Sequence, residues 1–277
     1  MPEERRAPRL GDVQETLLIP LYGRAVETRK RRGMIDDPRA VEMVEAIDYD
    51  FAKWDGARSL PGSTLRTLLF DAWVAAFLRR HPGGTVVEVG TGLNTRFDRL
   101  DNGTVHWFDL DLPDVIALRR EFFQDTDRRR MIAASVTDPS WLEDVRASAP
   151  GPYFIASEAV LLYLPQEEVR GVFEAVAERL PGAWLAAETA SAHMIDTQDG
   201  HDVLAAMAAR MRWRCDDPAE VTSWAPVELR ESRTFASLPP AVRARLPLHY
   251  RLMVRAMAVL QRKDAESYRF NLFRFSG

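Results

Sequence analysis

The chain has 277 residues, of which 46% are hydrophobic, and a formal net charge of −4 at pH 7. This length and apolar content suffice to bury a core as one large domain, and the acidic balance gives no electrostatic basis for binding nucleic acid. The single cysteine, Cys215, excludes an internal disulfide and a cysteine-based metal cluster. The N-terminal residues lack the apolar segment of a signal peptide, and no apolar run approaches the ~20 residues of a membrane span. We therefore expect a cytoplasmic protein with no membrane partner.

The first 80 residues predict helices that precede any strand. Residues 16–32 begin apolar and end basic, and Asp37-Pro38 combines a helix cap with proline at the first helical position. The segment after Pro61 carries a broad apolar stripe that ends at Pro82. This is more helix than a sheet requires, so we expect residues 1–80 to form a helical lid.

A strand, a glycine turn and a second strand follow in residues 84–113. Residues 85–89 predict a buried strand, which leads into the turn Gly90-Thr91-Gly92. The second apolar strand ends in Asp109 and Asp111. Glycines let the backbone approach a ligand, and an acid at the next strand tip binds ribose hydroxyls. This pattern is typical of a site for an adenosine-containing cofactor.

The residues leave the cofactor open between two kinds. A dinucleotide fingerprint requires a third glycine, at the position where this chain has Thr95. A site for S-adenosylmethionine needs only the turn, an acid on the first strand, here Glu88, and the ribose acid. Asp111 follows Gly90 by 21 positions, which suits either ligand. The incomplete fingerprint favours adenosylmethionine over NAD, and a turn without any cofactor is the third possibility.

Strands and helices alternate through the rest of the chain. Further strands are predicted at residues 130–135, 153–157, 184–187 and 268–275, which implies a mainly parallel sheet in an α/β fold. Polar residues stand at the predicted strand ends, where ligands bind in open α/β sheets. They are Glu88, Asp109, Asp111, Ser135, Asp138 and Glu158.

Four ordered segments resemble a known family. VVEVGTGLNTRFDRL, WFDLDLPDVIALRR, MIAASVTDPSWL and SEAVLLYL are similar to the leucine carboxyl methyltransferase superfamily, and within it to bacterial O-methyltransferases of the tetracenomycin-polyketide type. The N-terminal TLLIPLYGRAVETRKRRGMIDDPRA is similar to the same group. The resemblance covers roughly residues 13–190 and weakens over 190–277. It implies a Rossmann-like class I fold, with a mainly parallel seven-stranded sheet, a helical lid and S-adenosyl-L-methionine as cofactor.

The resemblance also implies roles for single residues. Arg24 and Arg66 match residues that hold the methionine carboxylate of the cofactor, a task that suits the guanidinium fork. Asp111, rather than Asp109, matches the ribose acid, and Glu158 matches an acid near the methionine portion. Ser135 and Val136 match the adenine-binding pair, although phosphatase-directed members carry an acid where this chain has Ser135. The expected cofactor residues are Arg24, Arg66, Glu88, Gly90, Gly92, Asp111, Ser135, Val136 and Glu158.

We expect one methyltransferase domain with an acceptor lid. Residues 84–190 would form the cofactor-binding sheet, residues 190–240 an acceptor lid insertion, and residues 241–277 the last helix and strand. The lid segments contain side chains that could contact a flat, apolar ligand. These are Met194, Met207, Met211, Trp213 and Trp224.

Methyl transfer needs few catalytic groups from the protein, because the sulfonium of adenosylmethionine is an activated methyl donor. A carboxylate acceptor is ionised at pH 7 and needs no base, whereas a hydroxyl acceptor benefits from one. His193 and His201, which follow the fifth predicted strand, are the candidate bases. No residue spacing indicates a metal site.

The predicted function is O-methylation of a small natural product in secondary metabolism, such as polyketide or antibiotic biosynthesis. Carboxyl methylation of another small acid or of a protein C-terminus is an alternative. A nucleotide-dependent oxidoreductase and a non-catalytic adenosylmethionine-binding protein are two more. The expected partner is a small-molecule acceptor, and the oligomeric state stays open.

Overall fold

The computed structural model describes residues 8, 10–11, 14–200, 208–260 and 266–277, with the backbone alone described at 257–260. Within these ranges the chain forms a seven-stranded sheet of order β3-β2-β1-β4-β5-β7-β6. β7 runs antiparallel to both of its neighbours, while β1 to β5 pair in parallel. The predicted α/β fold with a mainly parallel sheet is therefore confirmed. The strands are β1 (Thr85–Val89), β2 (His106–Asp111), β3 (Arg129–Ala133), β4 (Tyr153–Ser157), β5 (Trp184–Ala190), β6 (Val227–Arg233) and β7 (Tyr268–Phe275).

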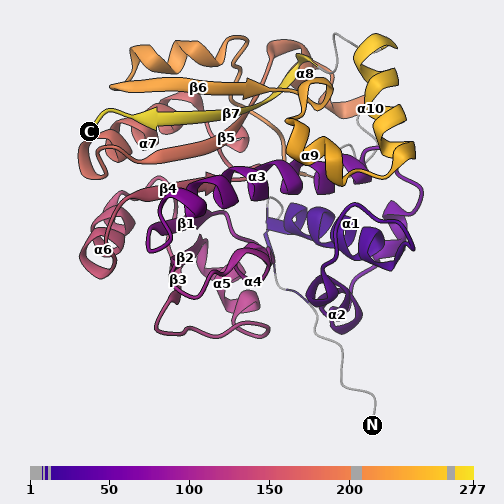
Figure 1. Cartoon of the computed structure of the whole chain (residues 1–277), viewed down its shortest axis with the longest axis horizontal. Coiled ribbons are helices and arrows are strands. Elements are labelled where there is room, and N and C mark those ends of the chain that lie inside the picture. Colours follow the sequence, from indigo (N-terminus) through magenta and orange to yellow (C-terminus); the bar gives the residue numbers. More distant parts are fainter. Residues whose placement is uncertain (1–7, 9, 12–13, 201–207, 261–265) are drawn as a thin grey trace.

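Helices surround this sheet (Figure 1). The α-helices are α1 (Leu18–Arg29), α2 (Pro38–Ala46), α3 (Leu60–Arg80), α4 (Arg96–Leu100), α5 (Pro113–Arg119), α6 (Ser140–Ser148), α7 (Gln166–Arg179), α8 (Ala192–Asp196), α9 (Pro240–Arg245) and α10 (Leu248–Leu260). The 3-10 helices are η1 (Gln14–Leu17), η2 (Phe51–Trp54), η3 (Leu161–Tyr163), η4 (Gln198–Gly200), η6 (Pro218–Ser223) and η7 (Phe235–Ser237).

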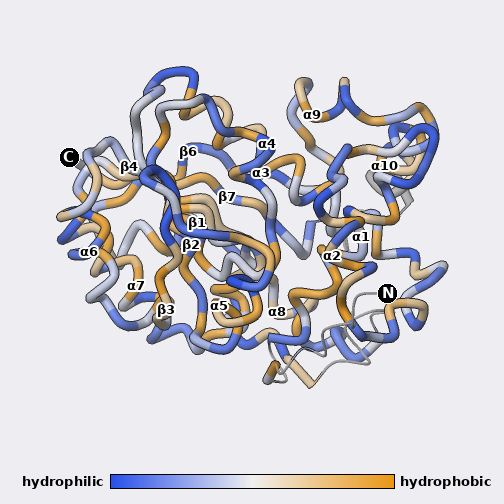
Figure 2. The backbone as a smooth tube through the Cα atoms, turned by 90° about the horizontal axis from the view of Figure 1, so that it is seen from below, coloured by the Kyte–Doolittle hydropathy of each residue, from blue (hydrophilic) through white to orange (hydrophobic). Residues whose placement is uncertain are grey.

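The two faces of the sheet bury separate hydrophobic clusters, because side chains alternate along each strand. Val87 and Val89 of β1 pack with α6 and α7, whereas Val86 packs with α3, α9 and α10. Figure 2 shows α6 and α7 on the opposite side of the strands from α3. The core thus has three layers, helix, sheet and helix.

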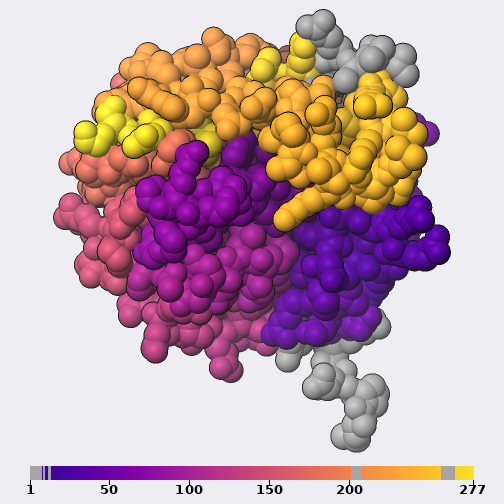
Figure 3. All heavy atoms as spheres, viewed as in Figure 1, coloured from indigo at the N-terminus to yellow at the C-terminus, as the bar shows by residue number. Residues whose placement is uncertain are grey.

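The N-terminal helices form a third cluster of their own. Leu18, Leu21 and Met43 are fully buried in it, together with Leu93 from the turn after β1 and Leu118 from α5. Figure 3 shows this part of the chain beside the segment of α9 and α10. There Lys30 Nζ donates to the Tyr250 hydroxyl at 2.8 Å. Of the predicted helices of residues 1–80, α1 and α2 therefore pack beside the turn that follows β1, whereas α3 packs on a face of the sheet.

Two predictions for the C-terminal part are wrong. The predicted lid insertion, residues 190–240, contains β6, which extends the sheet beyond β7. Its sequence, VELRESR, is mostly polar because an edge strand is solvated along much of its length, so hydrophobic patterning missed it. The single helix expected after residue 240 is divided into α9 and α10 at Pro247, which cannot continue a helical hydrogen-bond ladder.

Three acids on neighbouring strands point to the same face of the sheet. Glu88, Glu158 and Glu188 each stand two residues after an apolar core residue that packs toward α3. Because side chains two residues apart share a face of a strand, all three acids turn toward α3 as β1, β4 and β5 end. This face carries the charged part of the site described next.

Candidate active site

A cavity of about 1090 Å³ opens at the carboxyl ends of β1, β2, β3 and β4. Ligand sites in proteins typically enclose about 300–1,000 Å³, so this cavity has room for a cofactor and a second small molecule. Every residue predicted to bind the cofactor lies on its wall, with the exception of Glu88. Those on the wall are Arg24, Arg66, Gly90, Gly92, Asp111, Ser135, Val136 and Glu158.

The glycine turn needs glycine for two separate reasons. Gly90 and Gly92 have φ values of 62° and 48°, in the left-handed region that L side chains rarely adopt. A Cβ on Gly90 would also lie 2.1 Å from Val160 Cγ2, and one on Gly92 would lie 3.0 Å from Leu17 Cβ. The backbone can therefore turn tightly over the cavity only because both positions lack a side chain.

The structure separates the two acids of β2. Asp111 lies on the cavity wall, where Oδ2 accepts a hydrogen bond from Gly92 N at 2.7 Å and Oδ1 accepts one from Leu112 N at 2.8 Å. Burial raises the pKa of Asp111 to about 6, although both amide hydrogen bonds oppose this shift. Asp109 is 1% exposed and lies away from the cavity, paired with Arg119 Nη2 at 3.1 Å and Arg129 Nε at 2.7 Å. Of the two, Asp111 alone is placed to meet a ligand.

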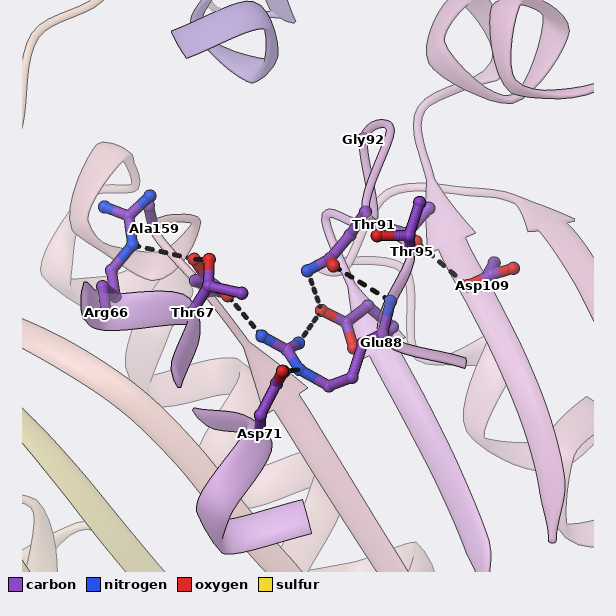
Figure 4. Close-up of polar contacts among 12 residues, drawn as sticks. Arg66, Thr67, Asp71, Glu88, Thr91, Gly92, Thr95, Asp109 and Ala159 are labelled. Atoms are coloured by element: carbon purple, nitrogen blue, oxygen red, sulfur yellow. Dashed lines mark hydrogen bonds and ion pairs between the residues drawn. The ribbon is translucent and has the colours of Figure 1, made fainter. Parts of the chain in front are cut away.

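A continuous series of buried ion pairs connects Arg24 to Arg66, and we call it the ion-pair chain. The contacts in order are Arg24 Nε to Asp37 Oδ2 (2.9 Å), Asp37 Oδ2 to Arg99 Nη1 (3.3 Å), Arg99 Nε to Asp71 Oδ2 (2.9 Å), Asp71 Oδ1 to Arg96 Nε (2.7 Å), Arg96 to Glu88, Arg96 Nη2 to Glu158 Oε2 (2.5 Å), and Glu158 Oε1 to Arg66 Nε (3.0 Å). Figure 4 shows Arg66, Asp71 and Glu88 within this group. Both predicted carboxylate-binding arginines are thus held by acids, at opposite ends of one network.

Arg66 and Glu158 lie on the cavity wall at one end of the ion-pair chain, as Arg24 does at the other end. Burial alone would lower the pKa of Arg66, but Tyr268, Glu158 and Glu188 raise it. Burial alone would raise the pKa of Glu158, but Arg96 and Arg66 hold it below its ordinary value. Thr67 Oγ1 also donates to Glu158 at 3.0 Å. Both side chains are therefore charged at neutral pH and are available to a ligand with a carboxylate and an ammonium group.

Glu88 lies behind the cavity wall rather than on it. Its carboxylate pairs with Arg96 and accepts a hydrogen bond from Asn94 Nδ2 at 3.0 Å. Since Glu88 shares its strand face with Val86, the carboxylate points toward α3. In this structure Glu88 fixes Arg96 and the turn residue Asn94, so any effect on a cofactor passes through them.

Sequence reasoning missed most of the ion-pair chain. Asp71 offered a signal, because it interrupts the apolar run LLFDAW of the helix before the first strand. A buried acid in such a run requires a cation, and here the cations are Arg96 and Arg99. Asp37 was identified only as a helix cap, and it does cap α2 through Ala40 N.

An apolar part of the cavity wall comes from later parts of the chain. Met194 and Met211 line it as predicted, together with Phe235, Met253 and Tyr268. Trp213 and Trp224 instead contact each other in the core beside α7, and Met207 lies outside the described residues. The two tryptophans therefore stabilise the fold and do not contact a bound molecule.

One of the two predicted bases, His193, lies among the described residues, and it is not on the cavity wall. His193 lies on α8, where its neighbour Met194 occupies the wall. His201 lies outside the described residues. Among the described residues no group of three His, Cys, Asp or Glu side chains could hold a metal ion, and no described helix is long and apolar enough to cross a membrane.

Comparison with known proteins identifies the family. A family model described as leucine carboxyl methyltransferase matches residues 18–177. The chain belongs to this family. Among the relatives of this chain, the tetracenomycin polyketide synthesis O-methyltransferase TcmP of Streptomyces glaucescens is 32% identical over 220 residues, which cover 79% of this chain and 81% of that protein. The S-adenosyl-L-methionine-dependent methyltransferase dpfgK of Gibberella zeae is 24% identical over 248 residues, or 82% and 83% of the two chains.

A solved structure shares the fold of this leucine carboxyl methyltransferase family member. A methyltransferase from Thermobifida fusca matches with a TM-score of 0.60 at 15% identity, over 94% of this chain and 95% of that one. The predicted family, the class I fold and adenosylmethionine as cofactor are thereby confirmed. The alternative of a nucleotide-dependent oxidoreductase is wrong.

Proposed function

We propose that this methyltransferase transfers the methyl group of adenosylmethionine to an oxygen atom of a small, largely apolar natural product. The observation that carries the proposal is the composition of the cavity wall, which combines charged residues, among them Arg66, Asp111 and Glu158, with the apolar side chains Met194, Met211, Phe235 and Met253. The similarity to a polyketide O-methyltransferase over four fifths of the chain supports the same acceptor class.

The charged residues of the cavity wall suit the ribose, carboxylate and ammonium groups of adenosylmethionine. Asp111 would accept hydrogen bonds from the ribose hydroxyls, beside the backbone of the Gly90 turn. Arg24 and Arg66 would bind the methionine carboxylate, and Glu158, held ionised by its arginines, would meet the ammonium group. Ser135 and Val136 lie beyond β3, where they would contact the adenine.

Ser135 departs from the family pattern, and the structure shows its local surroundings. Its hydroxyl lies 2.8 Å from Thr137 Oγ1, and its Oγ accepts from Thr137 N at 3.2 Å. We propose that this hydroxyl replaces the acid found elsewhere in the family as a hydrogen-bond partner of the adenine.

Transfer would depend on placement of the acceptor. The acceptor oxygen must lie in line behind the methyl carbon at close approach, which an enclosed apolar wall enforces by excluding other orientations and water. Since the N-terminal helices contribute Leu17, Ile19 and Arg24 to the wall, we propose that they act as the lid over the cofactor.

The product distinguishes hydroxyl from carboxyl acceptors. Purified protein would be incubated with adenosylmethionine and a panel of polycyclic phenols, aromatic acids and C-terminal peptides, and the methylated products would then be treated with mild base. A base-stable methyl ether supports the proposal. A base-labile ester would move the assignment to a carboxyl acceptor, and cofactor binding without turnover on any panel member would favour the non-catalytic alternative.

The histidine base is tested on the same substrate. His193→Ala should retain most of the activity, because His193 is off the cavity wall. A loss of most of the activity in His193→Ala, with the affinity for adenosylmethionine unchanged, would restore His193 as the base.

A further inference from the structure

Glu188 is a buried acid to which neither the sequence nor the family assigns a role. It lies on β5 and is 1% exposed. Its partner across the sheet is Phe270, and Ala190 pairs with Tyr268. Diagonal neighbours on one face of an antiparallel pair lie about 7–8 Å apart, within reach of long side chains. Glu188 therefore lies directly behind the part of the cavity wall that Tyr268 forms.

The carboxylate of Glu188 is only partly compensated. Oε2 accepts a hydrogen bond from Ala159 N at 2.9 Å, whereas Oε1 is buried without a hydrogen-bond partner. The nearest cation is Arg66, whose Nε lies 3.5 Å from Glu188 but 3.0 Å from Glu158. Glu188 therefore shares the Arg66 guanidinium with Glu158, and of the two carboxylates Glu188 is the more distant. Figure 4 shows Arg66 and Ala159 on this side of the site.

Glu188 extends the ion-pair chain and leaves it with an excess negative charge. The arginines are Arg24, Arg66, Arg96 and Arg99, and the acids are Asp37, Asp71, Glu88, Glu158 and Glu188. One acid therefore has no arginine of its own in a region of low dielectric, where such a charge is costly. Burial raises the pKa of Glu188 to about 7, which Arg66 opposes and Glu158 reinforces.

The other groups that face Glu188 do not titrate near neutral pH. Arg66 and Glu158 keep their charges, as described above. Burial raises the pKa of Tyr163 and of Tyr268, so both hydroxyls keep their protons. Within this group Glu188 is the side chain whose charge can change with the ligand.

We propose that Glu188 is ionised while the cavity holds adenosylmethionine and protonated while it holds the demethylated product. The two ligands differ by a methyl group and one positive charge on sulfur, and Arg66, Glu158, Tyr163 and Tyr268 line the cavity in front of Glu188. This inference rests on the proposed seating of the methionine part beside Arg66 and Glu158, and it does not depend on the acceptor.

The charges balance through the reaction. The bond between sulfur and the methyl carbon breaks with its electron pair on sulfur, and the acceptor oxygen forms the new bond to carbon. Sulfur thereby loses its positive charge, and the Glu188 carboxylate takes up one proton. That proton comes from the acceptor when the acceptor is a hydroxyl, and from solvent when it is a carboxylate. The cofactor sulfur and Glu188 together thus keep the same net charge before and after transfer, whichever acceptor is used.

Proton linkage tests the proposal with the cofactor alone. Adenosylmethionine and S-adenosylhomocysteine would be titrated by calorimetry at pH 7 in phosphate and in Tris, whose ionisation enthalpies differ. The homocysteine ligand should bind with the uptake of more protons, by up to one proton per site. The ratio of the two dissociation constants should change with pH, by at most about tenfold per pH unit. Sinefungin, which carries an amine in place of the sulfonium, should behave as adenosylmethionine does.

Glu188→Gln should remove the difference between the ligands and keep both binding reactions. Glu178→Gln, on the exposed face of α7, is the matched control and should retain the difference. Equal proton uptake for the two ligands in the wild type would overturn the proposal without any variant, which matters if Glu188→Gln folds poorly. A difference that persists in Glu188→Gln would also overturn it. Failure of the wild type to bind any of the three ligands would refute the proposed cofactor seating as well.

Discussion

Replacing Asp111 and Asp109 separately should give opposite kinds of defect, although the two acids are only two residues apart. Asp111→Asn keeps the size of the side chain but removes the charge that would accept from the ribose. A hydrogen bond to a charged group contributes about 1.5–3 kcal/mol, and the loss of one such bond lowers affinity by about 10- to 150-fold. The amide oxygen can accept from Gly92 N or Leu112 N but not from both, so the free energy of unfolding should fall by about 1–3 kcal/mol, less than in Asp109→Asn.

Asp109→Asn should mainly destabilise the fold. It removes the charge that neutralises Arg119 and Arg129, both of which are almost fully buried. Removing one partner of a buried ion pair typically costs about 3–5 kcal/mol, which for a domain of this size corresponds to a fall in melting temperature of about 10 °C. Adenosylmethionine affinity, measured on the folded fraction, should stay near that of the wild type.

Calorimetry at 25 °C and thermal unfolding of the two variants, without ligand, provide both readouts. The reasoning would be refuted by Asp109→Asn losing affinity at unchanged stability while Asp111→Asn binds normally. That outcome would place the ribose on the other acid and shift the register of the β2 tip by two residues.

Three further predictions concern the same site. Gly90→Ala should lower the melting temperature more than Gly103→Ala, because both glycines have positive φ but only a Cβ at Gly90 meets Val160. Adding Val160→Ala to Gly90→Ala should recover part of the lost stability, and equal losses in the two single variants would contradict the clash. Arg96→Met should lower the free energy of unfolding by about 3–5 kcal/mol, since it strips three buried acids of their shared cation; a denaturant titration with a loss below 1 kcal/mol would show that this part of the ion-pair chain is dispensable. Adenosylmethionine affinity should be nearly constant above pH ~7 and fall at lower pH, because protonation of Asp111, whose pKa burial raises to about 6, removes the charge that would meet the ribose; calorimetry should show a smaller fall in Asp111→Asn, and the part of the fall that belongs to Glu188 should remain there and disappear in Glu188→Gln.

Most of the correct predictions came from local patterns in the sequence. The β1 strand, the Gly90 turn and the choice of Asp111 over Asp109 depend on residues that lie within about 30 positions of one another, so periodicity, turn chemistry and family resemblance located them. The ion-pair chain could not be predicted in the same way. Its members come from α1, the N-cap of α2, α3, α4 and the ends of β1 and β4, and the pairing of Arg96 with Asp71 is visible only once the fold brings them together.

Other errors have equally local causes. The polar sequence of β6 hid an edge strand, and Glu88 was assigned to the cofactor from its position on β1 without regard to the strand face on which it lies. The alternation of Val86, Val87, Glu88 and Val89 was sufficient to show that Glu88 points toward α3, opposite to Val87 and Val89. A position near the end of a strand does not by itself place a side chain in a cleft, because alternate residues point to opposite faces of the sheet and the face must be considered as well.

The charged and the apolar residues of the cavity wall come from different parts of the chain, and under the proposed function this division has a consequence for specificity. The proposed cofactor residues lie between positions 24 and 158, where each charge depends on several others, so substitutions there are costly to stability. The proposed acceptor wall consists of Met194, Met211, Phe235 and Met253, which contribute shape and apolar surface and have no part in the ion-pair chain. Such a wall can change to fit another acceptor while the methyl donor stays in place. Tyr268 is the exception, because it lines the cavity and also faces Arg66 and Glu188, so a change of acceptor that requires its replacement would also disturb the charge of the cofactor site.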